Sequence, residues 1–377
     1  MRTSWAVVCS LFVPWAGLGA LSCAGTAEDA GEDVAVAAGA IAPTDQPRFH
    51  FVSFDSVAPG FFPQAIDNAG RVYGEFVEGD VGHAAVYAHG AVTVLQPDLP
   101  GAAFVVNAGG TAGGVVLLPS GDGFTQTAAL YRASGVEIIP LPPGDVGSSV
   151  VALSDGGTAV VDSFDADFNE SFRLYRNGQL GPPLSIAPAG TFITSIHINN
   201  QGILAGTLQG DTLRAYRFDT RTGELTLLEP IAGDPFTVGE GINNRGDVLG
   251  YSFCAPGEPG CTGDQATQER IGVWDRNDVF HTYFVEGNSQ FPTISNNLLF
   301  NETNEIVITA SFNDTTSYLV PRPGVRLPLV DLVDQLPPWP TPLARAVGMN
   351  NRGDIIGFGT LFTGEHPFLL ERVGNGP

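Results

Sequence analysis

Short runs that alternate apolar and polar residues recur along the chain, and many of them end in a turn rich in Asn and Gly. One example is "FTVGEGI" (236–242), which is followed by the turn "NNRG" and a second run, "DVLGYS" (247–252). Alternation over four to eight residues predicts a β-strand with one buried face. Asn and Gly adopt the positive φ of tight hairpin turns at the least cost. The pattern therefore predicts an antiparallel hairpin.

The same hairpin occurs seven times when the chain is aligned on the last residue of the turn. The aligned positions are Gly70, Gly110, Gly157, Gly202, Gly246, Asn304 and Gly353, at intervals of 40 to 58 residues. Two further apolar runs complete each unit, such as "IGVWD" and "FHTYFVE" in the fifth, and the first of the two usually carries a bulky aromatic residue. We expect these aromatic residues to form the core between units. Four short strands per unit with this period predict the blades of a β-propeller.

The two ends of the repeat region predict a closed ring. The seventh unit stops one strand short, after "HPFLLERV", while "RFHFVSFDS" (48–56) is a strand that belongs to no unit. Pairing the two completes the last blade and removes exposed strand edges. The predicted fold is all-β: a single seven-bladed β-propeller of four-stranded antiparallel blades over residues 48–377, closed by the N-terminal strand.

The N-terminal segment predicts export. Residues 1–22 combine a basic start at Arg2 with a mostly apolar stretch, which is the order of a signal peptide. Ala20-Leu21-Ser22-Cys23 is similar to a lipoprotein cleavage site, so we predict lipidation of Cys23, with cleavage to a soluble exported protein as the alternative. Residues 23–47 are small and acidic and predict a disordered tether. The predicted location is the outer membrane or cell surface, or alternatively the periplasm or the medium.

The repeat units resemble the bacterial extracellular HAF repeat. Residues 65–87, "AIDNAGRVYGEFVEGDVGHAAVY", match its turn, its Val-x-Gly strand and its His-Ala-aromatic strand, and "EHPFLL" (365–370) matches the end. The resemblance implies an exported, β-rich repeat protein. It implies no activity and no site residues.

Charge and cysteine content narrow the range of partners. The chain carries 40 acidic and 17 basic residues, a net charge of −23, and no lysine. Such a surface repels phosphate backbones, so nucleic-acid binding is not expected. Cys254 and Cys261 lie in one loop, "CAPGEPGC". In an exported protein this pair predicts a disulfide, although half of a metal site is the alternative.

The loop "DSFDADFNES" (162–171) is the strongest candidate for a ligand site. Asp165, Asp167 and Asn169 alternate as in the first half of a calcium loop, whereas Glu170 and Arg176 stand where an EF-hand needs Gly and a carboxylate. An EF-hand is therefore excluded. A looser Ca²⁺ site and a solvated acidic turn both stay open, and no other cofactor is expected. The candidate binding residues of this loop are Asp162, Asp165, Asp167 and Glu170.

The distribution of acidic residues favours a binding module. The loops between second and third strands, together with the connections between blades, emerge on the face opposite the Asn-Gly turns, and they hold many carboxylates. No catalytic motif is present, and no two histidines have metal-ligand spacing. We therefore predict a monomeric binding or scaffolding module for an unknown protein, peptide or glycan on this acidic loop face. The alternative is a glycan-active hydrolase or lyase that uses funnel carboxylates.

Overall fold

The structure is a computed structural model that describes residues 46–121, 123–231, 234–254, 261, 268–286, 298–309, 316–335, 343–359 and 366–374. The chain divides into two compact units, Met1–Ala38 and Gly39–Pro377, and every described residue belongs to the second. The predicted signal peptide, Cys23 and most of the predicted tether lie outside the described residues.

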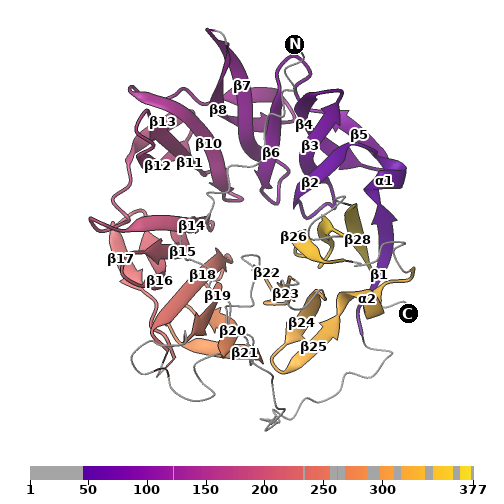
Figure 1. Cartoon of the computed structure of the whole chain (residues 1–377), viewed down its shortest axis with the longest axis vertical. Helices are drawn as coiled ribbons and strands as arrows, with labels where there is room; N and C mark the ends of the chain where they lie inside the picture. The colour runs from indigo at the N-terminus through magenta and orange to yellow at the C-terminus, as the bar shows by residue number, and fades with distance from the viewer. Residues whose placement is uncertain are drawn as a thin grey trace, which may run out of the picture. The chain divides into compact units, whose positions relative to one another are not determined.

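Seven four-stranded antiparallel sheets stand around a ring, which confirms the predicted β-propeller (Figure 1). From the inner to the outer strand, blade one holds β2 (Phe61–Ile66), β3 (Val72–Glu78), β4 (Val81–Ala88) and β5 (Ala91–Val94); blade two holds β6 (Gly101–Val106), β7 (Ala112–Ser120), β8 (Gly123–Arg132) and β9 (Gly135–Ile138). Blade three holds β10 (Asp145–Leu153), β11 (Ala159–Asp165), β12 (Glu170–Arg176) and β13 (Gln179–Pro183); blade four holds β14 (Phe192–Ile198), β15 (Ile203–Gln209), β16 (Leu213–Asp219) and β17 (Glu224–Leu227). Blade five holds β18 (Phe236–Ile242), β19 (Val248–Phe253), β20 (Glu269–Trp274) and β21 (Phe280–Glu286); blade six holds β22 (Leu298–Phe300), β23 (Ile306–Ile308), β24 (Tyr318–Arg322) and β25 (Val325–Pro328). Blade seven holds β26 (Arg345–Met349), β27 (Ile355–Phe358), β28 (Pro367–Val373) and β1 (Arg48–Ser53).

The N-terminal strand closes the ring, as predicted. β1 pairs antiparallel with β28, from Arg48 opposite Val373 to Ser53 opposite Phe368. The predicted strand over 48–56 is three residues too long, because residues 54–57 form a single helical turn, α1 (Phe54–Val57). This turn directs Phe54 into the core, where it is fully buried and makes edge-on contacts with other aromatic rings. A second helical turn, α2 (Leu329–Leu332), was not predicted.

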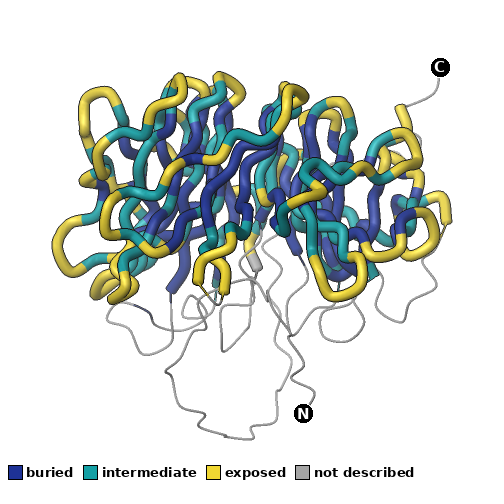
Figure 2. The backbone as a smooth tube through the Cα atoms, turned by 90° about the horizontal axis from the view of Figure 1, so that it is seen from above, coloured by how far each residue is buried: buried dark blue, intermediate teal, exposed yellow. Residues whose placement is uncertain are grey.

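The core lies between adjacent blades and inside each of them. Buried residues run through the middle of the blades, while most exposed residues lie in the turns and loops at the rims and on the outer strands (Figure 2). Five aromatic residues of the third strands are 8% exposed or less and belong to the core, as predicted: Tyr87, Tyr131, Tyr175, Tyr216 and Trp274. Tyr318, on the third strand of blade six, is half-buried.

The inner strands share one irregularity that bears on the channel they surround. Six of the seven contain a register shift near the middle, for example between Gly239 and Gly241 in β18. A β-bulge of this kind leaves one residue unpaired and redirects its side chain.

Within the described ranges, no helix has the length and apolar character needed to cross a bilayer.

Candidate functional site: the mouth of the central channel

The repeated turn follows each inner strand, and its first residue is a buried cap. In the seventh turn, Oδ1 of Asn350 accepts the backbone N–H groups of Arg352 (3.0 Å) and Asp354 (2.9 Å). Gly353, at the fourth position, has a φ of 85°, which favours glycine. The equivalent first residues are 2% to 6% exposed: Asp67, Asn107, Ser154, Asn199, Asn243, Asn301 and Asn350. The repeated motif is therefore a self-capped turn.

The amide of the first residue also joins neighbouring blades. Nδ2 of Asn350 donates to the carbonyl oxygen of Asp67 in the next blade around the ring (2.9 Å). Nδ2 of Asn199 reaches the carbonyl of Asn243 in the same way (3.2 Å). Asn therefore combines an oxygen that caps its own turn with an amide donor that bonds to the next turn, whereas the Asp67 carboxylate can only accept.

The second residue of the turn builds a ring of hydrogen bonds around the channel mouth. In six of the seven blades its side chain accepts a backbone N–H from the turn of the preceding blade around the ring. Asn351 accepts from Glu302 (3.1 Å), Glu302 from Asn244 (3.0 Å), and Asn244 from Asn200 (2.9 Å). Between the last and first blades, Asn68 accepts the N–H of Asn351 (2.9 Å).

The remaining part of the ring passes through blades two to four. Asn200 accepts the N–H of Gly156 (3.2 Å), and Oδ1 of Asp155 accepts the N–H of Ala108 (2.7 Å). Oδ2 of Asp155 also accepts from the amides of Asn200 and Asn244 (2.9 and 3.0 Å). In blade two this position is Ala108, whose side chain has no acceptor, so the ring is interrupted between Asn68 and Ala108.

A cavity of about 310 Å³ lies behind this polar ring, at the turn-side end of the channel. Its lining has two layers. The outer layer is made of turn residues, including the second turn residue of every blade except the fourth. The inner layer is the last residue of each inner strand: Ile66, Val106, Leu153, Ile198, Ile242, Phe300 and Met349. The cavity therefore offers a polar entrance and an apolar wall.

Two ionisable side chains, Glu240 and His197, line the same cavity from neighbouring blades. Glu240 is the extra residue of the bulge in β18. Burial raises its pKa to about 7, and burial lowers the pKa of His197 to about 4. Neither side chain has a hydrogen bond or ion pair to another described residue. Near neutral pH the imidazole is therefore uncharged, and the Glu240 carboxyl is balanced between its two forms.

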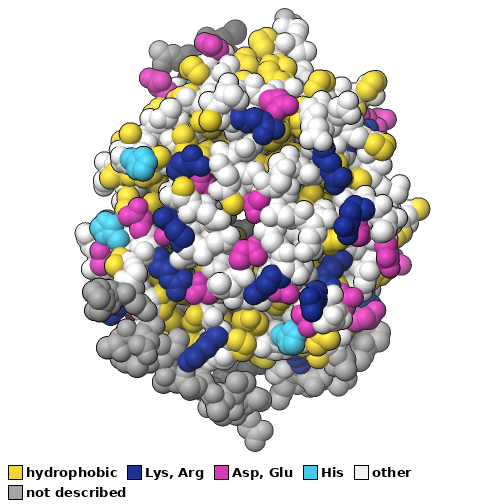
Figure 3. Space-filling model, turned by 180° about the vertical axis from the view of Figure 1, so that it is seen from behind, with side chains coloured by type: hydrophobic (Ala, Val, Ile, Leu, Met, Phe, Trp, Pro, Cys, Tyr) yellow, Lys and Arg dark blue, Asp and Glu magenta, His cyan; other side chains and the backbone are white. Residues whose placement is uncertain are grey.

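The face of the propeller that carries the seven repeated turns is called the turn face, and its charged side chains are arranged in two circles. Acidic side chains lie at the centre beside a hollow, and arginine side chains form a wider circle around them (Figure 3). Several of these arginines are paired, for example Arg71 with Asp67 (2.6 Å) and Arg372 with Glu305 (2.6 Å). Among the residues that the structure describes, no arginine lines the cavity, whereas Asp155, Glu240 and Glu302 do.

The four residues predicted from the acidic loop are divided between two surroundings. Oδ1 of Asp165 accepts the N–H groups of Asp167 (2.9 Å) and Asn169 (3.0 Å), so this carboxylate caps its own turn. Asp162 and Glu170 lie on paired strands, and burial, with the charge of Glu170, raises the pKa of Asp162 to about 7. Among the described residues, no group of three or more His, Cys, Asp or Glu could hold a metal ion. The calcium site at Asp165, Asp167 and Asn169 stays a prediction.

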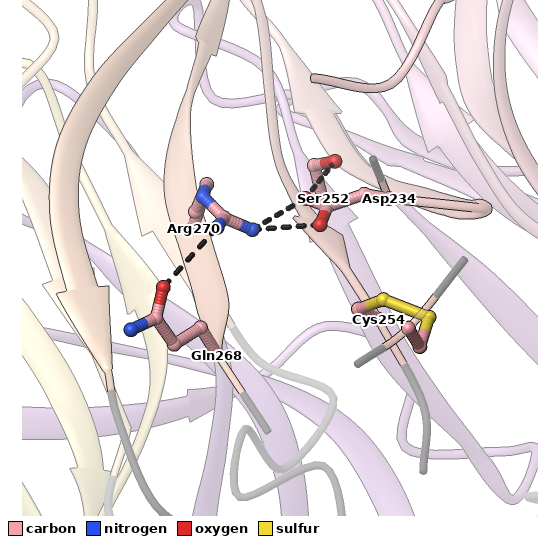
Figure 4. The surroundings of a disulfide bond; sticks show 6 residues. Asp234, Ser252, Cys254, Gln268 and Arg270 are labelled. Atoms are coloured by element: carbon pink, nitrogen blue, oxygen red, sulfur yellow. Dashed lines mark hydrogen bonds and ion pairs between the residues drawn. A yellow bond between two sulfur atoms is a disulfide. The ribbon is translucent and has the colours of Figure 1, made fainter. Parts of the chain in front are cut away.

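The predicted disulfide is present, and it lies beside a buried ion pair (Figure 4). Cys254 and Cys261 are bonded, with Cα atoms 5.6 Å apart. Both carboxylate oxygens of Asp234 accept from Nη1 of Arg270 (2.7 and 2.8 Å), and Ser252 donates to the same group (2.7 Å). Part of the charge predicted for the acidic loop face is thus neutralised within blade five.

The sequence did not reveal the channel mouth as a site. The sequence pattern explains the turns by architecture alone, and the spacing of the histidines does not single out His197. One signal was available: Glu240 is a carboxylate between two glycines in an otherwise largely apolar strand.

Comparisons with known proteins show the fold and no family. No family model and no curated protein matches the chain, so membership of the HAF repeat family stays a prediction. An oligogalacturonate lyase in complex with manganese has a similar fold, with a TM-score of 0.58, 10% identity, and coverage of 87% of this chain and 97% of the other. The oligogalacturonate lyase of Vibrio parahaemolyticus is similar, with a TM-score of 0.55, 9% identity, and coverage of 88% and 92%. TolB from Acinetobacter baumannii has a TM-score of 0.41 and 13% identity over 82% of this chain, and the match spans 65% of the TolB chain.

Proposed function

We propose that this protein is an exported, lipid-anchored binding module whose ligand enters the central channel from the turn face. The observation that carries this proposal is the pair of half-buried side chains, Glu240 and His197, which line a cavity with a polar entrance and form no hydrogen bond with another described residue. A concave site with an apolar wall and a few converging polar groups is typical of small-molecule binding. The acidic loop face remains a second proposed surface, for a protein, peptide or glycan partner.

Binding in the channel can be tested by filling it. Val106 lines the cavity, and Val106→Phe would reduce its volume. Val146, which is 47% exposed and outside the cavity lining, provides the matched control Val146→Phe. A panel of amines, sugars and amino acids would be screened by thermal shift. We expect at least one compound to stabilise the wild type and the control but not Val106→Phe. Equal stabilisation of all three proteins would place binding elsewhere.

Export is supported by the signal-like N-terminus and the Cys254–Cys261 bond, because such bonds persist in oxidising compartments. Labelled palmitate should enter the wild-type protein and Cys9→Ser, but not Cys23→Ser, in a bacterium that processes lipoproteins. Equal labelling of Cys23→Ser would contradict the anchor.

The second candidate is a glycan-active enzyme, and the carboxylates of the cavity favour it. Glu240, with a pKa of about 7, is suited to proton transfer near neutral pH. Asn244 bonds to both Asp155 and Glu302, so these two carboxylates lie near each other at the mouth. The lack of a lining arginine in the described ranges argues against anionic sugars. Saturable cleavage of a neutral glycan, abolished in Glu240→Gln, would make the enzyme the correct function.

A further inference from the structure

The charge balance of the cavity restricts what it can hold. Three carboxyl groups line it, those of Asp155, Glu240 and Glu302, together with Asp67, which is paired with Arg71. No Arg in the described part of the chain lines it, and the sequence contains no Lys. An anionic ligand would therefore be repelled by carboxylates and meet no Arg of the described residues, whereas a cation would be attracted.

The carboxylates at the mouth have no cationic partner among the residues that the structure describes. Asp155 accepts hydrogen bonds from the backbone of Ala108 and from two side-chain amides, and Glu302 accepts from the backbone of Asn244. These bonds fix the positions of both groups without neutralising their charge. The arginines of this face are instead held in the outer circle by other acids, for example Arg245 by Asp247 and Arg352 by Asp354.

Glu240 differs from the two mouth carboxylates because no described residue forms a hydrogen bond with it. It lies at the bulge of β18, is half-buried, and lines the same cavity as Ile242 and Phe300. A cation in the cavity would supply the partner that this carboxyl lacks among the described residues. His197, which lies on the adjacent blade, is uncharged near neutral pH and does not compete for the carboxylate.

The lining also argues against a bare metal ion. No metal-binding group of three or more His, Cys, Asp or Glu occurs in the described part of the chain. The last residues of the seven inner strands, together with Leu298 and Leu299, form an apolar wall behind the mouth. Such a wall suits a hydrocarbon body, and the carboxylates suit a single positive charge attached to it.

We propose that the channel binds a small organic cation, a primary ammonium group on an apolar body, with Glu240 as its counter-ion and Asp155 and Glu302 attracting it at the mouth. The inference rests on the proposed function, since it names the ligand class of the same site. Glu240 positions the ligand, and no chemical step is assigned to it.

The site makes a prediction about pH. Burial holds the pKa of Glu240 near 7, and a bound ammonium group stabilises its ionised form. Binding below pH 7 must then release a proton from Glu240, so affinity should fall by about tenfold between pH 8 and pH 6. An alkylammonium group stays charged over this range, because its pKa is close to the lysine value of about 10.4.

The other titratable groups near Glu240 do not give the same profile. Both β15 and β22, which pack against β18, carry no titratable side chain. The groups on the remaining neighbours are His197 on β14, Arg214, Tyr216, Arg217 and Asp219 on β16, Tyr251 on β19, and Asp155 and Glu302 at the mouth. The pKa of His197 is lowered to about 4, and burial raises the pKa values of Tyr216 and Tyr251, so none of these three changes charge between pH 6 and pH 8.

Cyclohexylamine and cyclohexanol form a matched pair of probes, equal in shape and different in charge. Calorimetric titration of the full-length protein at pH 8 should show at least tenfold tighter binding of the amine. Glu240→Gln should weaken amine binding at least tenfold and abolish its pH dependence. The affinity for the alcohol should stay within twofold of the wild-type value. Asp155→Asn, which keeps the Oδ1 acceptor of the ring, should also weaken amine binding. The control is Glu371→Gln, which removes one exposed carboxylate on β28 and so changes the net charge equally; it should not affect amine binding.

The outcomes separate this inference from the proposed function. If the alcohol binds as tightly as the amine and Val106→Phe blocks both, the channel is a binding site but the cation is not its ligand. The same conclusion follows if neither probe binds, but another compound binds to the wild type and fails to bind to Val106→Phe. If amine binding is unchanged in Glu240→Gln, the assigned counter-ion is wrong. If no compound binds, both proposals fail.

Discussion

Ring closure depends on two phenylalanines near the N-terminus, and removing both should open the propeller. Phe49 on β1 and Phe54 on α1 are both fully buried. Phe49 packs in the cluster that joins blades six and seven, with Leu329, Leu332 and Phe368. Phe54 packs in a separate cluster, where its ring centroid lies 5.2 Å from that of Phe61 and 4.9 Å from that of Tyr87.

The expected loss in free energy of unfolding follows from this packing. Replacing a fully buried Phe with Ala costs about 3–5 kcal/mol. Because the two residues belong to different clusters, their effects should add approximately, to about 6–10 kcal/mol. Whole domains are stable by only about 5–15 kcal/mol. The variant Phe49→Ala/Phe54→Ala should therefore lose most of its stability and expose the edge of β28.

Urea unfolding, followed by fluorescence and by size-exclusion chromatography, measures this loss. The matched control is Phe124→Ala/Phe192→Ala, which removes two phenylalanines that are 62% and 70% exposed and should cost less than about 1 kcal/mol. If the closure variant stays monomeric and within about 2 kcal/mol of the control, the N-terminal strand does not hold the ring together.

Three further predictions concern single features. Reduction of Cys254–Cys261, which are seven residues apart, should cost at most about 2–3 kcal/mol by loop entropy and leave the circular dichroism spectrum intact, and a collapse of the fold would contradict it. Ala108→Asn, by supplying the missing acceptor for Asn68, should raise unfolding free energy by about 0.5–1.5 kcal/mol, whereas Ala108→Leu should not. Asp162 has a raised pKa of about 7, so the folded state binds its proton more tightly than the unfolded state does, and this contribution is present at low pH and lost as pH rises toward 7. Asp162→Asn should flatten the fall in stability between pH 4 and pH 8 by up to a few kcal/mol, and an unchanged slope would show that this carboxyl is not the source.

Most of the fold could be predicted because its determinants are local. The turn needs a capping side chain and a residue of positive φ within four positions, and both recur in the sequence, including Asn304 with a φ of 61° in place of Gly. The end of β1 could not be predicted in the same way. Phe54 leaves the strand because of its contacts with Phe61 and Tyr87, and alternation along the chain does not reveal such contacts.

The candidate site was missed because its members meet only after closure. Asn351 and Asn68 are 283 residues apart, yet they are hydrogen-bonded in the ring. Glu240 lines the channel because the bulge between Gly239 and Gly241 adds a residue to β18, and regular alternation does not predict where a bulge occurs. The acidic loop was conspicuous in the sequence, but Asp165 uses its oxygens within its own turn.

The pairing of β1 with β28 also has a mechanical consequence. Arg48, the first residue of β1, and Val373, the last residue of β28, lie opposite each other at one end of the ladder. Tension applied between these two residues would therefore act across the strands and separate their residue pairs in order. The six register pairs would then break one after another under low force, beginning at Arg48. Heating has no such sequential route, because the buried contacts of Phe49 and Phe54 must be lost with the sheet. A molecule held at both ends in an optical trap should therefore open first at the seventh blade, at a force well below that needed to shear a strand of the same length.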